Sequence, residues 1–308
     1  MSRTDYLDDI SHIVMSAENK QIALEDLSQT LPPKAHYFIR VLRDILAGKE
    51  PNIAKLKRID SIWVMIFRLA KQSDKPKSAF LGQYCHIAKS KVVLSNKKYI
   101  VGYLYFIWVM LFLQISFSIT MVKILPVLES FFAGFGANLP KLTKLVINRD
   151  FQLITQIIFY VIAVLAILVP WLYIRQMKRL SPIPRYLRCL PFYMPLTRYY
   201  HRYLHTIFTG VYYRAGEDDP LRCAAKLLPK NHTMNEIEQG LLTVAMRQGS
   251  FEEVLQSQQE KLADSTTKVA RITDSLIGGL LFVFYAVLVA TYVIGAYLPI
   301  FMLGDVIG

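Results

Sequence analysis

Three long uncharged stretches interrupt a chain that is otherwise rich in charged residues. Each runs for more than about 20 residues without aspartate, glutamate, lysine or arginine, which is the length a helix needs to cross roughly 30 Å of hydrocarbon. Buried helices of soluble proteins rarely contain uncharged runs this long. The pattern therefore predicts three transmembrane helices, at 99–121, 151–174 and 275–299.

Between these stretches, apolar residues recur three and four positions apart, and proline or glycine marks where each run stops. Leu7, Ile10, Ile13 and Val14 show this helical spacing near the start. No segment shows the strict alternation typical of a strand. We therefore predict an all-α membrane protein in which the polar segments 1–98 and 175–274 form helical bundles.

The chain also carries an internal repeat. Leu-Pro follows the first apolar stretch at Pro126 and the last at Pro299, which lie 173 residues apart. Upstream, residues 69–72 and 87–90 resemble the residues 175 positions further on. A fixed period indicates that one unit is used twice. We predict a helical domain followed by a span, present in two copies, with an extra span between them.

The two copies differ in length. Between the Leu-Pro stop and a shared alanine, the first copy has 37 residues (33–69), whereas the second has 15 (230–244). The second copy is therefore shortened by about 22 residues, and we expect it to contain one helix fewer.

The distribution of basic residues predicts the orientation. Lysine and arginine total 17 in 1–98, 15 in 175–274 and 4 in 122–150. Because basic segments beside spans stay in the cytoplasm, both domains are expected inside, and 122–150 and the tail 300–308 outside. No signal peptide precedes residue 98 in this interpretation, so the first span acts as its own insertion signal.

The net charge of +13 fits this topology, because cytoplasmic segments beside anionic lipid are basic. The basic residues are scattered and no nucleic-acid motif is present, so we do not expect nucleic-acid binding. Cys85, Cys189 and Cys223 all fall in the expected cytoplasmic segments, where thiols stay reduced.

Patterns that would indicate catalysis or a bound cofactor are missing from the sequence. The acidic turn Glu217-Asp218-Asp219 has the chemistry for a divalent cation, although a solvated turn is the favoured interpretation. His201 and His205 have metal-ligand spacing but lack a third ligand, and the basic, aromatic cluster around them lacks a carboxylate partner. We therefore predict no catalytic residues, no cofactor and no metal.

Two motifs carry a resemblance to a known family. The stretch from Pro126 to Thr143 has Phe131 and Phe132 five and six positions after the proline, Gly136 ten after it, and then Leu139-Pro140. The other motif closes the last span, and its residues are Tyr297, Leu298, Pro299, Phe301 and Gly304. Both are similar to motifs of the type II secretion F / type IV pilus PilC family, whose plan of two domains and three spans also matches.

The resemblance implies a non-enzymatic platform protein of the cell inner membrane, in a type IV pilus or type II secretion machine. Its partners would be a cytoplasmic assembly ATPase, pilin or pseudopilin subunits, other inner-membrane components of the machine, and further copies of itself. The ten residues of the two motifs become candidates for the surface that receives the pilin. The alternatives are a small polytopic transporter or channel subunit, which the uncharged spans disfavour, and a membrane-bound enzyme.

Overall fold

The computed structural model describes helices joined by turns. The described residues are 10, 13–14, 16–47, 61–76, 78–83, 87, 108, 111–112, 115, 119, 122–123, 125–134, 141, 144–145, 148–229 and 234–307. No strand occurs among them. The prediction of an all-α protein is therefore confirmed for this part of the chain.

The chain divides into two compact units. Residues 1–96 and 173–270 form the first, which we call the polar unit, and 97–172 and 271–308 form the second, the apolar unit. The two polar segments of the sequence thus belong to one unit. The finer prediction of two separate, repeated bundles is not confirmed.

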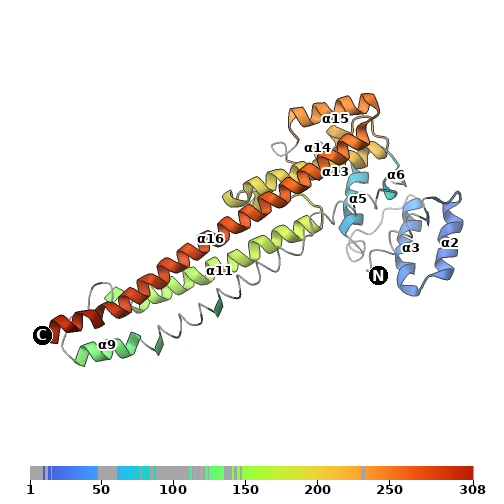
Figure 1. Ribbon diagram of the computed structural model, residues 1–308. Coiled ribbons are helices and arrows are strands. Elements are labelled where there is room, and N and C mark those ends of the chain that lie inside the picture. The colour runs from blue at the N-terminus through green and yellow to red at the C-terminus, as the bar shows by residue number, and fades with distance from the viewer. Residues whose placement is uncertain are drawn as a thin grey trace. The chain divides into compact units, whose positions relative to one another are not determined.

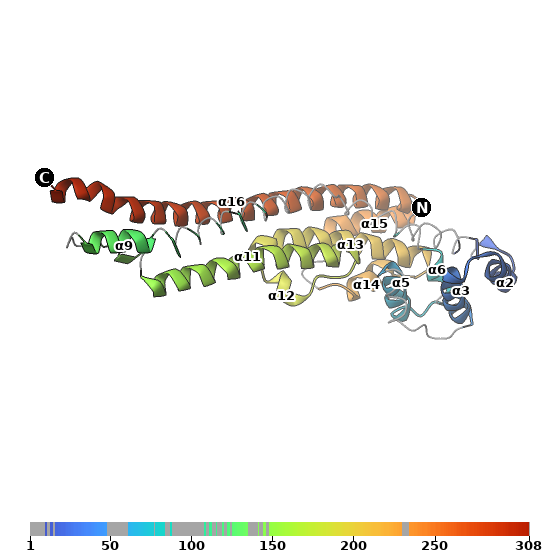
Figure 2. The ribbon, with the colours of Figure 1, turned by 90° about the horizontal axis from the view of Figure 1, so that it is seen from below.

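The first segment of the polar unit contributes α2 (Lys20–Thr30), α3 (Pro33–Leu46), α5 (Ser61–Lys71) and α6 (Ser78–Leu81). The Asn19 side chain caps α2 by accepting from the backbone N–H groups of residues 21 and 22, as an N-cap asparagine does. Helices α2 and α3 lie side by side (Figures 1 and 2). The ring of Phe38 on α3 lies 5.2 Å from that of Trp63 on α5.

The second segment centres on α13 (Met194–Arg214). The short helices α12 (Arg185–Arg188) and η2 (Pro191–Tyr193) precede it, and α14 (Pro220–Lys226) and α15 (Glu236–Gln248) follow. From Tyr203 to Tyr212 every residue of α13 is buried. A helix that is covered on all sides forms the core of its unit, so α13 organises the packing of the others.

Helix α16 (Phe251–Ile307) packs closely on α13. A Cβ atom added at Gly210 would lie 2.7 Å from Cδ2 of Leu255, so glycine permits the approach. Arg214 donates from Nε and Nη2 to the two carboxylate oxygens of Glu252, at 2.9 and 2.6 Å. The C-terminal end of α13 and the N-terminal end of α16 are thereby held together.

Residues of the two polar segments also share a core. The Tyr212 hydroxyl donates to the Leu69 carbonyl oxygen at 3.1 Å, and the Phe80 ring meets the Tyr212 ring edge-on at 5.9 Å. Ser73 donates to the Glu217 carboxylate. Burial, followed by Cys223 and Glu217, raises the pKa of Tyr212, so the hydroxyl stays protonated and donates.

The apolar unit contains α9 (Leu125–Gly134), most of α11 (Arg149–Lys178) and the C-terminal part of α16. Asn148 caps α11 by accepting from the backbone N–H groups of residues 150 and 151. Exposed apolar side chains cover both long helices in this unit, including Ile157 and Val164 on α11 and Leu280 and Val287 on α16.

Among the described residues, one helix is long and apolar enough to cross a membrane, judged by length and composition: Phe251–Gly295 of α16. The predicted second span lies within α11, where a shorter apolar helix, Leu153–Ile162, meets the composition test. Most of the predicted span 99–121 lies outside the described residues. The structure therefore supports membrane association, and the three-span topology is not confirmed.

Candidate functional site

The candidate residues after the first predicted span lie on and beyond α9. Pro126 is the second residue of α9 and is exposed. Proline is tolerated in the first turn because the N–H it lacks has no partner there. Phe131 lies further along α9, and Gly136, Leu139 and Pro140 lie outside the described residues.

The candidate residues at the third predicted span, Tyr297, Leu298, Pro299, Phe301 and Gly304, all lie within α16. Helix α16 runs through Pro299 and continues to Ile307, through most of the predicted tail 300–308. Proline removes one backbone hydrogen bond, and an apolar helix can continue through it where neighbouring groups satisfy the freed carbonyl. The Tyr297 side chain is exposed.

The histidines with metal-ligand spacing are part of the core of α13. His201 and His205 are both fully buried. The Ile183 backbone N–H donates to Nε2 of His201 at 3.0 Å, so this nitrogen is deprotonated and already has a partner. Burial lowers the pKa of His205 to about 4, which the Leu221 backbone opposes. The part of the chain that the structure describes contains no group of three or more metal-ligating side chains.

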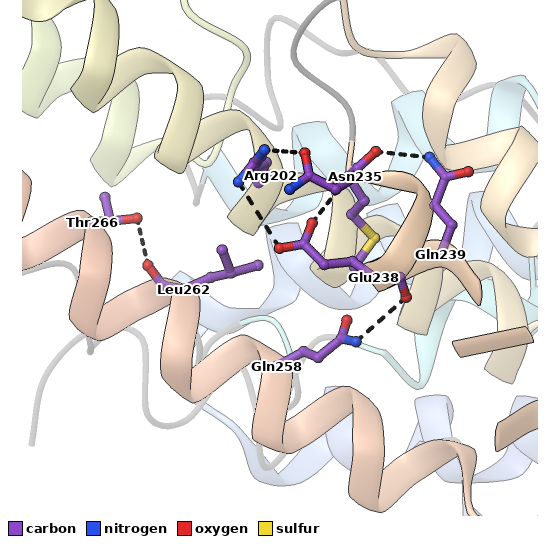
Figure 3. A network of polar contacts seen from close by, with 8 residues as sticks. Arg202, Asn235, Glu238, Gln239, Gln258, Leu262 and Thr266 are labelled. Carbon is purple, nitrogen blue, oxygen red and sulfur yellow. Dashed lines mark hydrogen bonds and ion pairs between the residues drawn. The ribbon is translucent and has the colours of Figure 1, made fainter. Parts of the chain in front are cut away.

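A polar network joins α13, α15 and α16 (Figure 3). Arg202 on α13 donates to the Asn235 side chain and lies 4.0 Å from the Glu238 carboxylate. The Glu238 carboxylate also accepts from the Asn235 backbone N–H at 2.9 Å. Gln258 on α16 donates to the Glu238 carbonyl oxygen at 3.4 Å. Glu238 therefore connects all three helices.

This network corrects the view that the basic, aromatic cluster around Arg202 lacks a carboxylate partner. Glu238 is that partner, 36 positions along the chain. The signal was present in the sequence, since asparagine followed three residues later by glutamate marks the start of a helix. The capping pattern predicts the start of α15, but it carries no information that Glu238 also faces α13.

The acidic turn serves as a structural connection. The Asp219 side chain accepts from the Arg222 backbone N–H at 3.1 Å and caps α14, and Glu217 accepts from Ser73. Burial, and then Glu217, raises the pKa of the Cys223 thiol. A raised pKa leaves less of the reactive thiolate, so the surroundings of Cys223 suppress its nucleophilic chemistry.

The geometry thus offers hydrogen-bonded helix contacts in the polar unit and exposed apolar helix surfaces in the apolar unit. Comparisons of the chain with protein-family models, curated proteins and solved structures find no match.

Proposed function

We propose that the chain is a platform protein of a type IV pilus or type II secretion machine, in the cell inner membrane, and that it resembles the F/PilC family. Its polar unit binds a cytoplasmic assembly ATPase. Its apolar unit crosses the membrane several times, with the N-terminus inside and the C-terminus outside, and receives pilin or pseudopilin subunits.

The observation that carries this proposal is α16. Its first turns are buried in the polar unit, at Phe251, Leu255 and Leu262. Its later turns expose apolar side chains, among them Leu276 and Val283, as a helix in lipid does. A displacement of the polar unit therefore has a continuous hydrogen-bonded helix through which to act on the membrane segment.

The pilin-facing surface is proposed at the motifs of α9 and at the C-terminal part of α16. Pro126, Val127 and Tyr297 are exposed there. An apolar helix arriving within a membrane gains no hydrophobic driving force, so shape and close packing decide where it binds. Proline and aromatic side chains at the ends of spans supply such a shape.

The proposal is tested by purifying the tagged full chain from its own cells in mild detergent. We expect the assembly ATPase and a pilin-like protein to co-purify. Purification without either partner would argue for the transporter or channel alternative.

The span-end surface is tested by Pro126→Ala and Pro299→Ala, with Pro191→Ala, an exposed proline of the polar unit, as the matched control. The two span-end variants should insert normally and reach the normal protein level but fail to assemble filaments. The control should assemble them. Normal filaments in both span-end variants would reject the proposed surface.

A further inference from the structure

The 175-residue offset in the sequence has a counterpart in the burial of α5 and α15. Phe67 and Leu242 are equivalent under this offset, and both are buried. Ala70 and Ala245 form a second equivalent pair, and both are buried. Beyond these helices the offset pairs Phe80 with Leu255 and Ile87 with Leu262, and these four residues are also buried. The two segments therefore present the same face to the core of the polar unit.

One stripe breaks this agreement. On α5, Ile62, Ile66 and Leu69 are 1%, 0% and 1% exposed. Their equivalents on α15, Ile237, Leu241 and Val244, are 78%, 55% and 50% exposed. Spacing of four and three residues places each trio on one side of its helix. A surface that is covered in the first copy is thus left open in the second.

The difference follows from what surrounds each helix. Helix α5 is covered by α6, by α3, whose Phe38 ring contacts Trp63, and by α13, whose Tyr212 hydroxyl donates to the Leu69 carbonyl oxygen. The second copy lacks about 22 residues in the stretch that holds α3 in the first. Helix α15 lies at the edge of the polar unit (Figure 1), with its other side on Phe251 and Leu255 of α16.

The charges beside the stripe indicate what covers it. Glu236 and Arg247 are both exposed and lie at opposite ends of α15. They are 11 residues apart, which is three turns, so both fall on the same flank of the stripe, about 16 Å from each other. A twofold axis that runs between two facing helices, perpendicular to both, makes them antiparallel and leaves the same flank of each helix on the same side of the pair. Glu236 of each copy would then lie opposite Arg247 of the other, which gives two such charge pairs.

We propose that α15 is a self-association surface, on which the stripe Ile237, Leu241 and Val244 packs against the same stripe of a second copy in an antiparallel pair. The midpoint between Glu236 and Arg247 along α15 nearly coincides with the midpoint between Ile237 and Val244. Both midpoints lie next to Leu241, so the twofold axis passes near this residue. Self-complementarity of this kind is what a twofold interface requires. The inference rests on the membrane location in the proposed function and not on the platform role.

The size of the surface sets where the pair forms. A stable interface in solution buries about 1,200–2,000 Å², which is more than one 13-residue helix pair provides. Molecules held in one membrane meet at a high effective concentration, and α16 is apolar enough to cross a membrane. The contact is therefore expected to form in membranes and to weaken on dilution in detergent.

Cysteine cross-linking in membranes tests the register. In the full chain with Cys85, Cys189 and Cys223 replaced by serine, Leu241→Cys places the two thiols at the axis. Facing helices 8–10 Å apart put their Cα atoms about 4–6 Å from each other there, within disulfide reach. Ile237→Cys is the matched control, since its copy lies about 12 Å away along the helix. Leu241→Cys should give a disulfide-linked dimer under mild oxidation, and Ile237→Cys should not.

Charge reversal tests the partner. Glu236→Arg alone, or Arg247→Glu alone, puts like charges opposite each other and should reduce cross-linking of the Leu241→Cys chain on the order of tenfold. Combining both reversals should restore it. Each reversal also opposes the helix dipole, so a mere loss of helix stability would make the combination worse than either change alone.

Three results would overturn the proposal: no dimer from Leu241→Cys, equal cross-linking from Ile237→Cys, or no recovery in the combined reversal. A mixed disulfide with a different protein in place of the dimer would also overturn it, and would assign the stripe to that partner.

Discussion

Burial decides the chemistry of the two histidines on α13. The sequence places His201 and His205 one turn apart, which is the spacing of metal ligands, but it favours packing because a third ligand is missing. The structure buries both inside α13, with Nε2 of His201 accepting from the Ile183 backbone. Helical spacing predicts which residues share a face, but the partners of that face come from segments the spacing does not describe.

His205 gives a pH-dependent stability. Its pKa in the folded protein is about 4 and its ordinary value is 6.5. Below pH 6.5 the unfolded chain binds a proton that the folded protein refuses until about pH 4, so the free energy of unfolding falls as the pH falls between these values. The free energy of unfolding falls by about 3 kcal/mol over this window. Below about pH 4, His205 causes no further loss.

The measurement is the melting temperature of the full chain in detergent from pH 7 to pH 4. His205→Gln should flatten the dependence, because it removes the titrating group. An unchanged slope in His205→Gln would contradict the assignment.

Elements were predicted well where apolar spacing and stop residues agree. Helices α3, α5 and α15 lie in the two polar segments that the sequence predicts to be helical. The sequence does not reveal that α16 runs on through Pro299, because a proline is typical of a helix end in water. Gly210 marks the place where α13 and α16 cross. A glycine is compatible with many roles, so the sequence does not predict this contact.

That crossing gives a second prediction. Gly210→Ala gains about 1 kcal/mol of helix propensity, but its methyl group meets Leu255 at 2.7 Å, and overpacking costs about 1–3 kcal/mol. We expect a net loss of about 1 kcal/mol, seen as a lower melting temperature. In a Leu255→Ala background the methyl group has room, so the same change should raise the melting temperature. A loss of equal size in both backgrounds would show that Leu255 is not the cause.

At the scale of the whole molecule, the basic residues predict a topology that can be measured directly. A reporter active only outside the cytoplasm should give signal when fused at Asn138 or after Gly308, and none at Asn52 or Asn231. The physical reason is that basic flanks of spans stay inside. Signal at Asn231 would place the polar unit's second segment outside and would reject both the topology and the platform proposal.

The joining of 1–96 and 173–270 in one unit is the feature least accessible to sequence reasoning. The sequence favours two bundles, because each polar segment has its own apolar faces and stops. The contact between Tyr212 and Leu69 spans 143 positions, and a contact at that separation leaves no periodicity in either segment.

The same contact has a consequence for how the protein is made. The ribosome finishes α5 and α6 well before it reaches α13, and at about 5–20 residues per second the interval is on the order of ten seconds. During that time Phe80 has been synthesised but its partner Tyr212 has not. Newly made N-terminal helices must wait for the downstream segment, so their apolar faces depend on protection during synthesis until α13 arrives.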